Sequence, residues 1–154
     1  MKETKMKKSL MGLLVALCAS SAFAVEPGVT AKQAAIGAAV ADSVSTHLAL
    51  QAGAVETNPL VHTSVGGLVL LAGIKLGVLS WVDDSASLSA KEKESAHRTM
   101  TSLWGGVTAN NLLLATAATG PVAIVGGRIT GVVLWNLDYA PPAPVVAAAN
   151  PVTP

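Results

Sequence analysis

The chain has 154 residues, of which 51% are hydrophobic and 12% are charged. Its length suits one domain, and its charged content is about half of the roughly 25% typical of soluble domains, which indicates a membrane protein. From Val25 onward, six Lys and Arg residues stand against eight Asp and Glu residues, so nothing favours a nucleic-acid partner. Cys18 is the only cysteine, and the chain after it can form no disulfide, thiolate nucleophile or Cys-based metal site.

Residues 1–24 are typical of a secretory signal peptide. A basic start, MKETKMKKSL, precedes the short apolar stretch LMGLLVALCA and then AFA, whose small residues suit a cleavage site. We therefore expect a mature chain that begins at Val25. An uncleaved first membrane anchor is the alternative interpretation.

The first helix after the signal peptide is predicted to begin near Thr30. Thr30 and Gln33 have the spacing of a capping box, and Gly53 is a suitable helix stop. The next residues, GAVETNP, predict a tight turn between helices. In that turn Asn58 and Pro59 suit the N-cap and first position of a second helix, and Glu56 complements the positive end of its dipole.

Three further apolar segments follow the turn. The segment that opens at Pro59 is about 24 residues long, or roughly 36 Å as a helix, which is enough to cross a bilayer. The polar loop 83–98 contains a second capping box, Ser89 with Glu92, so a third helix is expected to start near Ala90. Pro121 opens the fourth helix after the short turn TGP.

The predicted fold class is all-α, an integral membrane bundle of four transmembrane helices that spans residues 25–140. Each segment is apolar around nearly its whole circumference, whereas a soluble surface helix keeps a charged face. The Pro- and Ala-rich residues 141–154 are expected to form an extended or disordered tail. Gly and Ala recur at close spacing, which favours close helix packing within the chain, with a second copy or with other membrane subunits.

The signal peptide predicts an inner-membrane protein whose polar loop 83–98 and C-terminal tail face the periplasm. The positive-inside rule disagrees mildly, because this loop holds Lys91, Lys93 and Arg98 while the opposite turns hold no Lys or Arg. A one-sided aromatic belt is expected near the same periplasmic side, made of Trp81, Trp104, Trp135 and Tyr139.

Several polar side chains are expected in the middle of the membrane. Helical rise places Asp42 roughly 18 Å, Asn110 roughly 15 Å and Arg128 roughly 11 Å from the inner face, while Lys75 lies roughly 25 Å away and has a long side chain. Ionisable groups at this depth face inward and pair with one another. Asp42 is expected to pair with Lys75, and Asn110 or Asn111 to lie near Arg128.

These charged residues allow two interpretations. One is a structural set that fixes helix register. The other is a proton, ion or substrate path that also includes His47.

The segment DSVST (Asp42, Ser45, Thr46), the turn GAVETNP and Lys75 together resemble a family of small bacterial multi-pass membrane proteins of unknown function. The similar region covers about residues 36–80. The resemblance implies a membrane helical hairpin in which five residues act as a set: Asp42, Glu56, Asn58, Pro59 and Lys75. It implies no reaction and no cofactor.

Three functions are open on the sequence. The favoured one is a structural or accessory subunit that packs against membrane partners. The alternative is a small ion or proton channel, transporter or lysis-type pore. An enzyme is less favoured, because Ser43 or Ser45 beside His47 and Asp42 is the only candidate catalytic group and no known catalytic, metal or nucleotide motif accompanies it.

Overall fold

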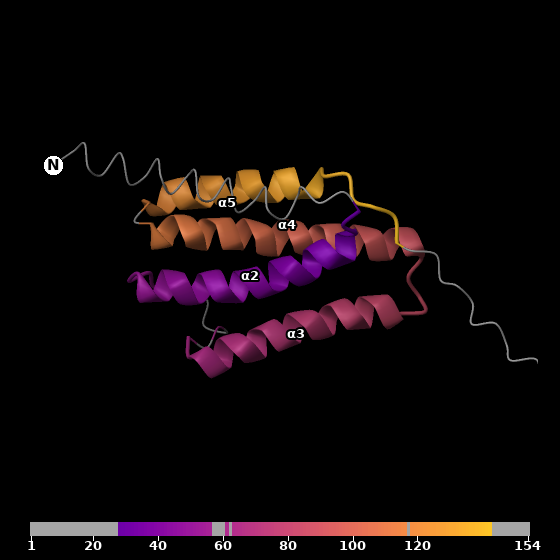
Figure 1. Cartoon of the computed structure of the whole chain (residues 1–154), viewed down its shortest axis with the longest axis horizontal. Helices are drawn as coiled ribbons and strands as arrows, with labels where there is room; N and C mark the ends of the chain where they lie inside the picture. Colours follow the sequence, from indigo (N-terminus) through magenta and orange to yellow (C-terminus); the bar gives the residue numbers. More distant parts are fainter. Residues whose placement is uncertain (1–27, 57–60, 62, 117, 143–154) are drawn as a thin grey trace, which may run out of the picture.

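The computed structural model describes residues 28–56, 61, 63–116 and 118–142. This part of the chain forms four helices: α2 (Ala31–Gln51), α3 (Val65–Asp84), α4 (Ala90–Ala115) and α5 (Gly120–Trp135). They lie side by side in the spatial order α3, α2, α4, α5 (Figure 1). The described residues contain no strand, only an isolated bridge between Thr30 and Ala140. The predicted all-α class is therefore confirmed.

Both predicted capping boxes start helices. Thr30 Oγ1 accepts from the Gln33 backbone N–H at 3.2 Å, and Gln33 Oε1 accepts from the Thr30 N–H at 2.9 Å. Ser89 and Glu92 make the equivalent pair of bonds at the start of α4. Each box satisfies two backbone donors that a helix start leaves unpaired. At the other end of α2, Gly53 adopts a φ of 91°, which residues with a Cβ rarely take.

The predicted start of the second helix is wrong. Helix α3 begins at Val65, with Ser64 as N-cap accepting from the Gly67 N–H at 3.1 Å. A serine hydroxyl followed by a flexible Gly pair offers a cap that the sequence interpretation overlooked. Asn58 and Pro59 lie outside the described residues. Pro121 does lie in the first turn of α5, as predicted, but this helix ends at Trp135 and has only 16 residues.

The helices form an open row rather than a closed bundle. Helix α4 packs along both α2 and α5, α3 packs on α2 and touches α4 little, and α5 has no close backbone approach to α2 or α3. Small residues allow the α4–α5 contact: a Cβ added to Gly106 would stand 2.8 Å from the Gly127 carbonyl oxygen. The predicted meeting of four helices around one polar centre is therefore wrong, because α3 and α5 lie on opposite sides of the α2–α4 pair.

Among the described helices, only α3 is long and apolar enough to cross a membrane. Helix α5 is apolar but shorter. The prediction of four membrane spans thus stays a prediction. The proposed signal peptide, residues 1–24, and most of the C-terminal tail lie outside the described residues.

Candidate functional site: a buried ion pair beside a polar cavity

The most unusual feature of the interior is an ion pair between helices α2 and α3. The Lys75 Nζ donates to Asp42 Oδ2, and both side chains are at most 10% exposed. Lys75 lies at the middle of α3, about 15 Å from either end by helical rise. The pair therefore joins α2 and α3 at mid-helix, where neither charged side chain can reach the ends of the helices.

Helix α4 completes the polar cluster through Asn111. The Asn111 amide Nδ2 lies 2.9 Å from Thr46 Oγ1, 3.3 Å from Ser45 Oγ and 3.4 Å from Asp42 Oδ1. Ser45 and Thr46 in turn donate to the Asp42 backbone carbonyl at 3.0 and 2.8 Å, the local bonding expected from the sequence. The Asp42 carboxylate thus has a cation and an amide as partners, which offsets part of the cost of its burial.

Trp104 of α4 also approaches the pair. The Lys75 Nζ lies 5.6 Å from the centroid of the Trp104 ring, within the range of a cation–π interaction. Trp104 therefore lies beside the middle of α3, and its expected place in an aromatic belt stays a prediction.

A cavity of about 530 Å³ adjoins the ion pair. Asp42, Lys75, Asn110 and Asn111 supply polar groups to its wall, and Glu56 lines the same cavity. Of the predicted turn motif, Glu56 is thus placed at the site, while Asn58 and Pro59 lie outside the described residues. A second cavity at the polar end of the molecule shares no lining residue with the first.

Of the other predicted cluster members, Asn110 shares this cavity with Asp42 and Lys75, but Arg128 and His47 do not line it. Asn110 lines the cavity but bonds only weakly to its neighbour, with Nδ2 3.5 Å from Asn111 Oδ1. Arg128 is exposed on α5, so its predicted burial is wrong. His47 faces a different groove between α2 and α3, with its Nε2 3.0 Å from Gln51 Nε2. Asn111, and not the adjacent Asn110, is on the face of α4 that contacts Asp42.

Within the described residues, the serine and histidine of the candidate catalytic set do not pair with one another. Ser43 Oγ donates to the Ala39 carbonyl at 3.4 Å and makes no bond to His47. Within the described residues no group of three or more His, Cys, Asp or Glu side chains is placed to hold a metal ion. The chemistry available is that of a charged pair, two amides and hydroxyls in an apolar surrounding, which suits register, binding or charge passage.

A second polar cluster lies where α3 ends and α4 begins. Asp83 pairs with Lys32 at 2.6 Å, and its backbone carbonyl accepts from Lys93 Nζ at 2.5 Å. His97 is buried, with Nε2 3.3 Å from Asp83 Oδ1 but without hydrogen-bond geometry. Burial lowers the pKa of the His97 imidazole below its usual value, although Asp83 acts in the opposite direction. The sequence alone did not predict this cluster.

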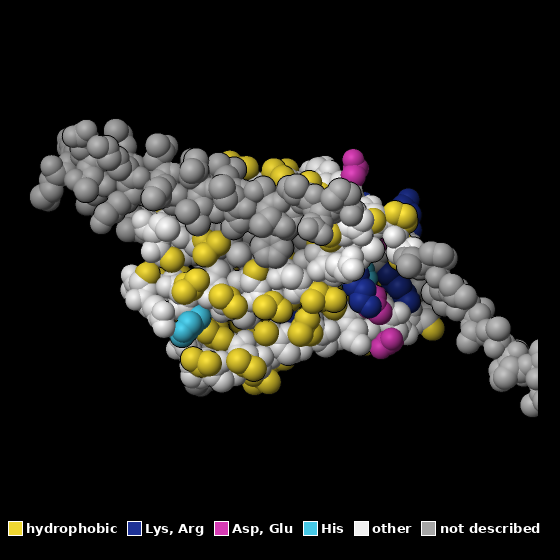
Figure 2. Space-filling model, viewed as in Figure 1, with side chains coloured by type: hydrophobic (Ala, Val, Ile, Leu, Met, Phe, Trp, Pro, Cys, Tyr) yellow, Lys and Arg dark blue, Asp and Glu magenta, His cyan; other side chains and the backbone are white. Residues whose placement is uncertain are grey.

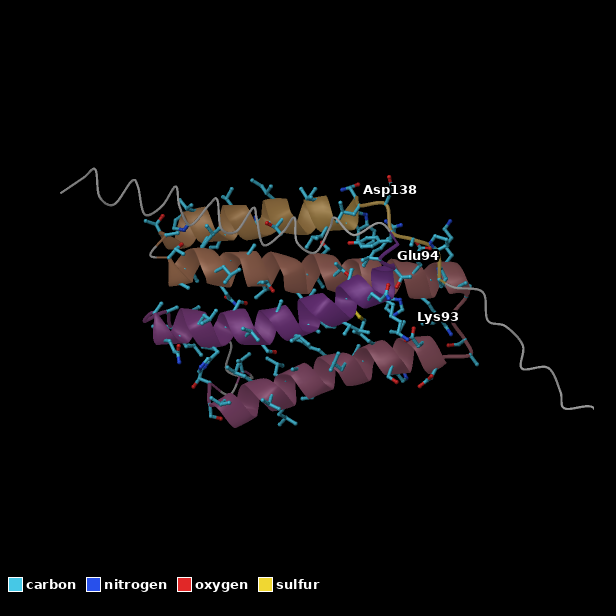
Figure 3. The ribbon with its side chains drawn as sticks, viewed as in Figure 1. Lys93, Glu94 and Asp138 are labelled. Carbon is cyan, nitrogen blue, oxygen red and sulfur yellow. The ribbon has the colours of Figure 1, made fainter. Side chains whose placement is uncertain are left out.

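Charged side chains gather at the same end of the molecule. Lys93, Glu94 and Asp138 lie there together (Figure 3). Arg98 ties α4 to the residues after α5, because it donates to the Leu137 carbonyl at 2.8 Å and stacks 4.8 Å from the Tyr139 ring.

The chain matches no protein-family model, and no curated protein or solved structure shows significant similarity to it. The resemblance to a small membrane protein family thus remains a prediction.

Proposed function

We propose that the protein is a multi-pass inner-membrane subunit with a structural or accessory role, which packs against other membrane proteins. The observation that carries this proposal is the outer surface. Large apolar side chains are exposed on every described helix, including Val44 (55%), Val69 (67%), Leu103 (61%) and Val132 (64%). Apolar side chains cover the middle of the face in Figure 2, and charged side chains gather at one end. Lipid or partner helices would cover such a surface.

The central polar cluster fits a structural role in this setting. The Asp42 and Lys75 charges cancel inside the chain, and Asn111 binds the carboxylate and both hydroxyls. Apolar surfaces give little driving force for pairing in lipid, so interhelical polar contacts fix which faces meet. The pair would hold α3 against α2 at a defined register and leave the outer side of α3 free for partners.

The experiment is purification of the tagged full chain from native membranes. We expect it to resist alkaline carbonate extraction and to copurify in mild detergent with another membrane protein at a constant molar ratio, measured by quantitative mass spectrometry. Release by carbonate would refute membrane insertion. Purification as a lone homo-oligomer would refute the accessory role.

A small pore is the second candidate, and the cavity beside Asp42 and Lys75 favours it. In this case the cavity would have to connect to the opposite end through movement of α3 or through assembly of several copies. Flux of protons or monovalent ions through proteoliposomes that contain the purified protein tests this candidate. Flux that disappears in Lys75→Met while the protein still assembles would favour the pore over the accessory role.

A further inference from the structure

Arg128 is an exposed charge in the middle of an apolar helix. It is the ninth residue of the 16 in α5, about 12 Å from either end by helical rise. Nothing in the described residues pairs with it: no hydrogen bond or ion pair involves its guanidinium. One turn away on either side, Ile124 and Val132 are 52% and 64% exposed. Within the described residues, the charge is therefore unpaired on a mostly apolar surface.

A groove of about 550 Å³ runs along α4 and α5 beside Arg128. Leu103, Val107 and Asn110 of α4 form one wall, and Ile124, Arg128 and Val132 of α5 form the other. Gly106, Gly127 and Gly131 lie between the walls, where the two backbones touch. The floor of the groove is therefore backbone and its walls are side chains. A groove of this shape can accommodate a third helix.

The position of Arg128 requires an anionic partner. An arginine at the bilayer centre is costly unless it pairs, reaches water or snorkels to the headgroups. Arg128 lies eight residues from Gly120 and seven from Trp135, so its side chain has no short way to either end of α5. A carboxylate on a neighbouring helix would pair with Arg128 and so offset the cost of placing its charge in the bilayer. The Asn110 amide, on the opposite wall, could donate to the same carboxylate.

A second copy of this chain does not supply that carboxylate. Among the described acidic residues, Asp42 is the one in the middle of a helix, and it is buried against Lys75. The others lie near helix ends or in connections: Glu56, Asp83, Asp84, Glu92, Glu94 and Asp138. Charge complementarity thus favours a different protein over self-association.

We propose that the α4–α5 groove binds a transmembrane helix of another membrane protein, and that an Asp or Glu near the middle of this helix pairs with Arg128. The inference rests on the proposed membrane function and adds the contact surface and the chemistry of the partner. The low glycine floor lets the helix approach, and the Arg128 pair selects it from apolar competitors.

The test is site-specific photocrosslinking of the full chain in living cells. The photoreactive residue p-benzoylphenylalanine replaces Val132 on the groove wall or, as a matched control, the equally exposed Val69 on α3. We expect Val132 to crosslink to a membrane segment that contains Asp or Glu, identified by mass spectrometry of the joined peptides. Arg128→Leu should reduce this adduct at least about tenfold, the equivalent of about 1.4 kcal/mol. Arg128→Lys should retain most of it, and the Val69 adducts should not change.

A charge exchange makes the test specific. Arg128→Glu should abolish the Val132 adduct, and replacing the partner's acidic residue with Arg should restore it. The proposal is overturned if Val132 crosslinks only to lipid, to a second copy or to residues 1–27 of the same chain, or if the adduct does not depend on Arg128. If a partner copurifies at a constant ratio but crosslinks only through Val69, the accessory function stands and the groove assignment is wrong. If carbonate releases the chain, the membrane function itself fails.

Discussion

Helices α3 and α5 flank the same α2–α4 pair, but they are attached by different means. Helix α5 packs on α4 through backbone contact, since Gly106, Gly127 and Gly131 leave no room for a Cβ. The glycines of α3 are different, because a Cβ on Gly66, Gly73 or Gly77 would meet nothing within 4 Å. Helix α3 is instead joined by charges, through Lys75 with Asp42 and Asp83 with Lys32.

This difference shows that small-residue spacing alone does not predict which helix face packs inside the chain. The same small-residue spacing occurs on both helices, yet only in α5 is it used for packing inside the chain. On α3 it leaves a smooth exposed face. Polar contacts are then needed to fix α3, because close backbone packing is absent there. Removing the charges should therefore affect α3 most, and removing the glycines should affect α5 most.

The largest effect is expected from Asp42→Asn. This change leaves Lys75 buried without a counter-charge, so we expect a loss of about 3–5 kcal/mol in the free energy of unfolding. The double variant Asp42→Asn with Lys75→Met should recover much of it. Unfolding in detergent of wild type, both single variants and the double variant gives the coupling energy.

Lys32→Gln is the matched control for Asp42→Asn, because its ion pair also joins α3 but the Lys32 side chain is 51% exposed. Water replaces the lost partner there, and the expected loss is about 0–1 kcal/mol. Equal losses for Asp42→Asn and Lys32→Gln, or strict additivity in the double variant, would contradict the role given to the buried pair.

A smaller effect is expected at the α4–α5 contact. In Gly106→Ala the new methyl group would stand 2.8 Å from the Gly127 carbonyl oxygen, which is backbone and can move only with α5. We expect a loss of about 1–3 kcal/mol, typical of overpacking. Gly73→Ala on α3 should instead gain about 0.5–1 kcal/mol from its higher helix propensity. Unfolding midpoints of both variants that move in the same direction would show that the glycines of α3 and α5 are equivalent.

Local signals in the sequence were enough to predict much of the fold. Thr30 with Gln33 and Ser89 with Glu92 place two helix starts correctly, because a capping box is satisfied within four residues. The start of α3 was mispredicted since Asn58–Pro59 and Ser64 both offer N-cap chemistry, and tertiary context chooses between them. No local rule indicates that α5 would stay away from α2 and α3.

The sequence predicted how deep each polar residue of the site lies along its helix, but not which face of the helix it occupies. Counting residues placed Asp42 and Lys75 near one another, and the structure joins them. Depth carries no information about which face a residue occupies, so Asn110 was predicted in the central cluster where the structure has Asn111, and Arg128 was placed inside. The hundred-degree step between Asn110 and Asn111 could be resolved only by the α2–α4 packing. Trp104 at Lys75 carried no signal in the sequence.

The smallest effect is expected at the polar end, where buried His97 provides a dependence on pH. Its neighbours there are Asp83, Lys32 and Lys93. Burial is the main cause that lowers its pKa below the usual 6.5, and the two lysines act in the same direction, against Asp83. A lowered pKa means that the unfolded chain binds the proton more readily than the folded chain. Stability should therefore be full above about pH 6.5 and decline as the pH falls below it.

The free energy of unfolding should decline gradually with falling pH. Only the His97 side chain contributes, and Asp83 opposes part of the lowering of its pKa. Unfolding in detergent from about pH 8 down to about pH 5.5, a range in which ordinary carboxylates stay ionised, isolates the imidazole from Asp and Glu. His97→Gln keeps a polar side chain of similar length but cannot titrate, so the slope between about pH 6.5 and pH 5.5 should flatten in this variant. An unchanged slope would assign the pH dependence to another group. A slope of opposite sign in wild type would mean that Asp83 holds His97 protonated and that the attraction outweighs burial.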